Sequence, residues 1–136
     1  MTRLVDATAR PATSTQDRDA KIERILKNFV GLKGVTAAAL VDADGLVTHA
    51  QRDFNLDVDA LGAAVQVTFG AAQVASGHVG QGASELILVE SKEGYVMLAP
   101  LHKGFTAALV ADRSAMLGVL RFELKQTIPL LNAIFS

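Results

Sequence analysis

The most unusual hydrophobic pattern in the chain lies in residues 57–80, which have too few polar side chains for an ordinary surface helix. No residue between Asp59 and Glu85 carries a formal charge. At about 100° of rotation per residue, a helix here places bulky apolar side chains on one side and small ones on the opposite side. The bulky side consists of Val58, Leu61, Val65, Phe69, Ala72 and Val79, and the small side consists of Ala60, Ala63, Ala64, Val67, Ala71 and Val74. Between them runs a polar strip of Asp59, Gln66 and Gln73, flanked by Gly62 and Gly70.

A helix that is apolar around most of its circumference needs to be buried on two sides. We expect the bulky side to pack on the core of its own domain. The small side permits close approach of another backbone, and the simplest partner for it is the same helix of a second copy. The pattern therefore predicts an interface between protein chains.

The chain before this helix divides into a leader and a first helix. Residues 1–16 have no periodicity and read as a flexible leader, so the single domain is expected to span residues 17–136. Ser14 or Asp17 can cap a helix that runs to about residue 32, with Gly31 and Gly34 at its end. Its apolar stripe consists of Ile22, Ile25, Leu26 and Phe29.

The other segments predict strands and a last helix. Residues 35–42 and 46–51 form a hairpin around an Ala-Asp-Gly turn, and residues 85–91, 95–101 and 105–111 predict three more strands with short connections that end in glycine. Asp112 is expected to cap the last helix, and Pro129 either kinks this helix or begins a separate tail. The residues expected to face the sheet are Met116, Leu117, Leu120, Leu124 and Ile128. The order α-β-β-α-β-β-β-α predicts an α+β domain with an antiparallel sheet between helices.

Composition narrows the class of protein. The 136 residues suffice for one domain, and 50% hydrophobic and 20% charged residues are ordinary for a globular protein. A net charge of −1 gives no reason to expect binding to nucleic acid or attraction to an acidic membrane. Cysteine is absent, which excludes disulfides and thiolate sites and is compatible with the expected cytoplasmic location. The uncharged stretch contains two Gln and several Gly, so we expect a buried helix and no membrane insertion.

Residues that could carry catalysis do not form a recognisable site. Asp53, Asn55 and Asp57 begin like a calcium loop, but Val58 and Ala64 stand where that loop needs Gly and Glu. The histidines at positions 49, 78 and 102 lack the spacing of a zinc site, and the Gly-rich residues 77–82 leave a helix where a phosphate loop would open one. The serines lack a nucleophile elbow. We therefore expect no enzyme, no cofactor and no metal.

The strand at residues 85–91 is the second candidate for an interaction. Its Leu-Ile-Leu-Val run at residues 86–89 has no charge to protect a free edge. If it is an edge strand, two copies can pair it antiparallel while their uncharged helices pack side by side. The alternative is that the strand lies in the middle of the sheet. Leu86 and Ile87 thus join Ala60, Ala63, Ala64, Val67, Ala71 and Val74 as predicted interface residues.

In their order and spacing along the chain, these features resemble the roadblock, or dynein light-chain, family, whose bacterial members include mutual gliding protein B. The resemblance spans about residues 22–131. It rests on Gly34-Val35, the Val-Asp-Ala-Asp-Gly-Leu hairpin at residues 41–46, the Ala/Val-rich helix from Leu61, Glu90, Gly94, Leu-Val-Ala at residues 109–111, and Gly118 with Arg121.

The resemblance implies a five-stranded antiparallel sheet with the first and third helices on one face and the second helix on the other. It also implies a homodimer, or a heterodimer with a paralogue, joined through the third strands and second helices. Members of the family are non-catalytic adaptors that bind small Ras-like GTPases and sometimes modulate hydrolysis or exchange. The alternative is a scaffold subunit of a motor-like or filament-associated assembly. Arg52 and Arg113 are candidate cations for a GTPase, although a solvated surface role explains each more simply. A pocket for a small molecule beneath the central helix is a third, weaker hypothesis.

Overall fold

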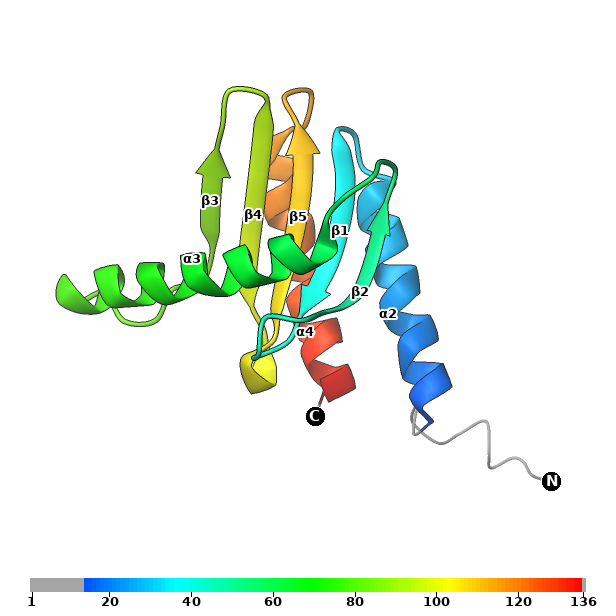
Figure 1. Ribbon diagram of the computed structural model, residues 1–136, viewed down its shortest axis with the longest axis horizontal. Helices are drawn as coiled ribbons and strands as arrows, with labels where there is room; N and C mark the ends of the chain where they lie inside the picture. The colour runs from blue at the N-terminus through cyan, green and yellow to red at the C-terminus, as the bar shows by residue number, and fades with distance from the viewer. Residues whose placement is uncertain (1–13, 136) are drawn as a thin grey trace.

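The computed structural model of the protein describes residues 14–135. Its elements are α2 (Thr15–Val30), β1 (Val35–Val41), β2 (Val47–Arg52), α3 (Val58–His78), β3 (Ile87–Glu90), β4 (Gly94–Pro100), the short helix η1 (His102–Gly104), β5 (Thr106–Asp112) and α4 (Leu117–Phe135). The strands form one antiparallel sheet, with α3 across one face and with α2 and α4 on the other (Figure 1). The predicted fold class and its distribution of helices are confirmed.

The first helix begins slightly earlier than the pattern predicts. Ser14 is its N-cap, and the Ser14 hydroxyl accepts a hydrogen bond from the Asp17 backbone N–H at 3.0 Å. Thr15 is the first residue of α2, two residues before the expected domain boundary, and most of the predicted leader lies outside the described residues. Gly31 ends the helix, as expected.

The strand order is β2-β1-β5-β4-β3, so β2 and β3 are the two edges of the sheet. The prediction that β3 is an edge strand is therefore confirmed, and the alternative of a central strand is wrong. β4 pairs with β3 on one side and with β5 on the other. Within residues 14–135, no strand pairs with the opposite side of β3.

The sheet separates two apolar layers of unequal size. Alternate residues such as Leu40, Met97 and Leu109 face α2 and α4 and form the larger core cluster. On the opposite face, the buried cluster beneath α3 consists of Val41, Val65, Leu98 and Ala108. Because the layer beneath α3 is small, the sheet covers only part of that helix.

The start of α4 differs from the prediction. Asp112 does not cap the helix, because Asp112 ends β5 and its carboxylate accepts hydrogen bonds from the backbone N–H and the hydroxyl of Ser114 in the following turn. The helix begins later, at Leu117. Met116 was expected to face the sheet, but it precedes the helix and is 60% exposed.

The C-terminal segment continues α4 through Pro129 to Phe135. Of the two expected alternatives, a separate tail is therefore wrong. Proline removes one backbone donor from the helix, but Leu124 and Leu131 on either side of Pro129 are fully buried. The Phe135 ring also stacks on Phe105, with 4.2 Å between the ring centroids. Packing against the sheet thus holds the last turns in helical form.

Candidate interaction surface

The exposed side of α3 is the small apolar side that the sequence predicts. Ala60, Ala63, Ala64 and Ala71 are exposed, and Val67 and Val74 are exposed by 73% and 60%. The opposite side packs on the sheet through Val65 and Phe69, which are buried. Val79, which was expected on the buried side, caps the end of the helix and is 67% exposed. The single chain thus buries one side of α3 and leaves the other open.

The geometry of α3 increases this exposure. The helix runs across the strands of the sheet, and its C-terminal part extends beyond the edge strand β3 (Figure 1). A stretch of α3 is long and apolar enough by composition to cross a membrane, yet only 17% of that stretch is buried in the chain. One side of α3 is bound to the sheet, and the other side is open.

The polar strip of α3 bonds to loops of the same chain. The Gln66 side-chain amide donates to the carbonyl oxygen of Asp42 at 2.7 Å, and the Gln73 side-chain oxygen accepts from the backbone N–H of Ser84 at 2.6 Å. Gly62 lies directly against Gly45 in the hairpin turn, without room for a Cβ. These contacts fix the rotation of α3, so that the small apolar residues point away from the sheet.

The edge strand β3 lies beside α3 and presents apolar side chains on both faces. Leu88 and Val89 are exposed by 44% and 39%, whereas Leu86 and Ile87 are half-buried against the two core layers. Leu86 and Ile87, the predicted interface residues, thus contribute partly to the core. Leu88 and Val89 are the more accessible side chains, but the sequence did not distinguish them from their neighbours. The alternation of side chains along a strand does not show how much of each face other elements cover.

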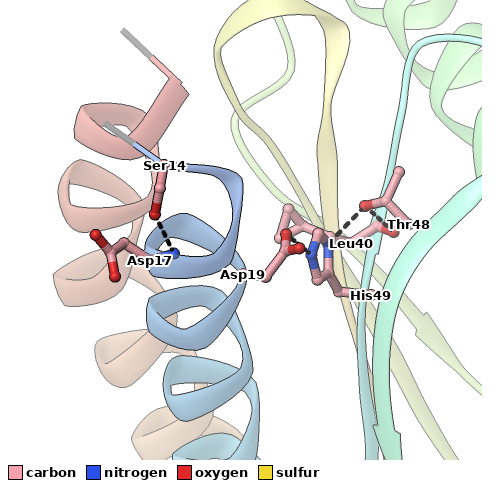
Figure 2. A network of polar contacts seen from close by, with 6 residues as sticks. All are labelled: Ser14, Asp17, Asp19, Leu40, Thr48 and His49. Carbon is pink, nitrogen blue, oxygen red and sulfur yellow. Dashed lines mark hydrogen bonds and ion pairs between the residues drawn. The ribbon is translucent and has the colours of Figure 1, made fainter. Parts of the chain in front are cut away.

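His49 connects the edge strand β2 to α2. His49 Nε2 lies 2.8 Å from Asp19 of α2, and His49 Nδ1 lies 2.9 Å from the Thr48 hydroxyl, so the residue ties β2 to α2 (Figure 2). Asp57 is the N-cap of α3, and its carboxylate accepts from the Ala60 N–H. No group of three His, Asp or Glu residues within 14–135 is placed to hold a metal ion.

Arg113, one of the two candidate cations, is engaged within the chain. Its guanidinium donates to Glu90 at 2.8 Å and to the Ser91 carbonyl at 3.1 Å, and it lies 4.9 Å from the centre of the Tyr95 ring. The hydrogen bond to Glu90 raises the pKa of Arg113 above its ordinary value. Arg113 thus joins the turn after β5 to the end of β3. Arg52 is exposed at the end of β2.

The neighbouring Asp112 yields a testable prediction about pH. Hydrogen bonds from the Ser114 hydroxyl and backbone N–H hold the pKa of Asp112 below its ordinary value. A lowered pKa stabilises the fold above the unfolded-state pKa, and this contribution is lost as pH falls through the folded-state pKa. We expect Ser114→Ala to move the pKa of Asp112 upward, because it removes the largest cause of the shift. A carboxyl-carbon NMR titration checks this, and an unchanged Asp112 pKa contradicts it.

A groove of about 470 Å³ opens on the part of the sheet that α3 leaves uncovered. Val96 and Val110 pair across β4 and β5 in its floor, and Phe54, in the loop that leads to α3, forms one wall. Phe54 is 42% exposed. Sequence reasoning did not find this residue, because a lone aromatic residue in a polar loop gives no periodic signal.

Comparison with known proteins identifies the family. A sequence model of the Roadblock/LC7 domain matches residues 21–111, and the chain therefore belongs to the Roadblock/LC7 domain family. Two uncharacterized proteins of Methanocaldococcus jannaschii are each 27% identical to it over 114 residues, which cover 84% of this chain and 99% of each relative.

Solved structures share the fold at lower sequence identity. MglB of Myxococcus xanthus matches with a TM-score of 0.78 and 17% identity over 85% of this chain and 94% of that one. A structure described as MglB with tetrameric arrangement matches with a TM-score of 0.81 and 17% identity over 93% of this chain and 96% of that one. The resemblance to the roadblock family that was seen in the sequence is thereby confirmed, and the chain shares its fold with MglB.

Proposed function

We propose that this protein is a non-catalytic, dimeric adaptor that binds a small Ras-like GTPase in the cytoplasm and modulates its GTP hydrolysis or exchange. The observation that carries the proposal is the exposed, uncharged side of α3 beside the free edge of β3. Isolated exposed apolar residues are common, but a continuous apolar helix face next to an unpaired strand is typical of an interface.

In the proposed dimer, two copies of β3 pair antiparallel and continue the sheet from one copy into the other. This two-fold arrangement places both α3 helices on the same face of the joined sheet. Ala60, Ala63 and Ala71 have short side chains that permit close helix packing, while Val67 and Val74 contribute most of the apolar area. A heterodimer with a paralogue would use the same surfaces.

The GTPase is proposed to bind on the α3 side of the dimer. Support comes from the membership in the Roadblock/LC7 domain family, from the MglB-like fold, and from the groove lined by Phe54, Val96 and Val110 next to α3. Because Arg113 is held by Glu90, we do not propose that it is donated to the nucleotide. The adaptor would instead act by positioning groups of the GTPase itself.

The test is GTP turnover by a small Ras-like GTPase of the same organism, measured with and without this protein, together with co-elution in the GDP and GTP-analogue states. We expect co-elution that depends on the nucleotide and a changed turnover or exchange rate. Phe54→Ser is expected to weaken binding, and the matched control Val119→Ser, at an equally exposed position (42%) on the opposite face of the sheet, should not. Co-elution that is independent of the nucleotide, with no rate change, would favour the scaffold alternative. Absence of any binding would contradict the proposed partner class.

A further inference from the structure

The outer surface of α4 carries an apolar stripe that neither the core nor the proposed dimer uses. Val119, Phe122 and Leu130 are exposed by 42%, 60% and 59%. At about 100° per residue they lie opposite the buried stripe of Leu120, Leu124 and Leu131. The helix is therefore apolar on two sides, and the outer side has no partner within the described chain.

The cations within residues 14–135 are concentrated on the helices that cover one face of the sheet. Of the eleven Lys and Arg residues within 14–135, seven lie on α2, the turn after it, and α4, whereas only four of the thirteen Asp and Glu residues lie there. These cations are Arg18, Lys21, Arg24, Lys27, Lys33, Arg121 and Lys125. The acids of this layer are Asp17, Asp19, Glu23 and Glu123. The net charge of −1 conceals this distribution: the α2/α4 layer is basic, and the rest of residues 14–135 is acidic.

The apolar stripe and the cations share one surface. α2 and α4 lie on the same face of the sheet (Figure 1), and a groove of about 340 Å³ between them is lined by Ile25, Phe29 and Leu130 among others. Lys21 and Arg24 on α2 and Lys125 on α4 are exposed. An exposed apolar stripe bordered by Lys and Arg is the pattern of helices that adsorb to anionic lipid surfaces.

We propose that the α2/α4 layer docks on an anionic lipid bilayer, with Phe122 and Leu130 at the headgroup boundary and Lys21, Arg24 and Lys125 against lipid phosphates. A second copy of the same layer fits less well, since it would bring like charges together. In the proposed dimer both α2/α4 layers lie on one side of the joined sheet, opposite both α3 helices, so two weak contacts would act together. The joint action of two layers rests on the dimer of the proposed function, whereas the lipid contact of a single layer does not.

The experiment is co-sedimentation of the full chain with vesicles of phosphatidylcholine containing about one-third phosphatidylglycerol, compared with phosphatidylcholine alone. We expect binding to the anionic vesicles only, and loss of binding at high salt. Lys21→Glu with Arg24→Glu is expected to weaken binding by about tenfold or more. Phe122→Gln should weaken it with no change in charge.

Matched controls place each change elsewhere on the molecule. Arg52→Glu with Lys92→Glu alters the net charge equally outside the layer, and Leu46→Gln removes an equally exposed apolar residue; both variants should bind as the unaltered chain does. Equal losses in the control and layer variants, binding to neutral vesicles, or no binding to anionic ones overturns the proposal. Retention by an acidic amphipathic peptide without vesicle binding also overturns it. Val67→Asp, on the exposed side of α3, is designed to separate the proposed dimer without altering the α2/α4 layer. Weaker vesicle binding by this variant would therefore support two layers acting together, and unchanged binding would overturn that part of the proposal.

Discussion

Val67→Asp is expected to convert the proposed dimer into a monomer that remains folded. Val67 is 73% exposed in the single chain, so an aspartate there costs little in an isolated copy. In the proposed dimer the same position is covered by α3 of the second copy, where an unpaired carboxylate costs several kcal/mol. This corresponds to a weakening of the dimer by about a thousandfold. Sedimentation equilibrium over a range of protein concentrations measures the change.

The matched control is Val119→Asp, which makes the same substitution at an exposed valine of α4 on the opposite face of the sheet. This variant should stay dimeric. Ala71→Lys should weaken the dimer as Val67→Asp does, because the cost arises from burying an unpaired charge of either sign. If the Val67 variant is still a dimer of unchanged stability, α3 does not form the contact.

Gly62→Ala is expected to destabilise the fold, although alanine is intrinsically the better helix former. A Cβ at Gly62 would overlap the backbone carbonyl oxygen of Gly45, and Gly45 itself has φ +84 in the hairpin turn. Backbone atoms cannot rotate away as a side chain can, so α3 and the hairpin have to separate. We expect a net loss of about 2 kcal/mol, since this overpacking exceeds the roughly 1 kcal/mol gain in helix propensity.

The control is Gly118→Ala in the first turns of α4, where an added Cβ meets no atom within 4 Å. This variant should be more stable by up to about 1 kcal/mol. Urea unfolding of both variants at one protein concentration keeps any contribution of the dimer equal. A Gly62 variant as stable as the Gly118 variant would show that the hairpin and α3 are not in fixed contact.

Much of this fold could be predicted from the sequence because its signals are local. Ser14 and Asp57 begin helices as N-caps, Gly31 ends the first helix, and the Gly45 turn closes the hairpin. The two-sided apolar pattern of α3 also indicated that one side would be open, and Val67 and Val74 confirm that exposure.

The predictions for single residues were wrong where tertiary contacts, and not the local sequence, decide between two possible conformations. Asp112 had the chemistry of a helix cap, but its carboxylate bonds Ser114 in a turn that delays the helix by a few residues. Val79 had the right periodicity for the core, but α3 extends beyond the sheet before that residue (Figure 1). The hydrophobic pattern predicts which side of a helix a residue lies on, but it does not predict how far along the helix the sheet extends.

The outer stripe of α4 and the basic α2/α4 layer were also missed. The spacing of Val119, Phe122 and Leu130 places them on one side of a helix, but a helix that is apolar on two sides does not itself show that one of them stays exposed. The charge asymmetry needed the fold, because net charge does not show that α2 and α4, which carry most of the cations, pack together on one face of the sheet. Which charged helices pack next to each other depends on the topology of the fold, and composition alone does not give it.

The most direct test of the proposed dimer is the distance between two copies at β3. The chain lacks cysteine, so Leu88→Cys offers a single site for a spin label on the exposed edge strand. If the β3 strands pair, the labelled positions lie in adjacent strands about 5 Å apart in the pairing direction, and dipolar coupling should report a short, narrow distance distribution. The same label at Thr48 on β2 should report a long distance, since the two β2 strands lie nine strand spacings apart, about 43 Å. Absence of coupling at Leu88, or a shorter distance at Thr48 than at Leu88, would contradict the account.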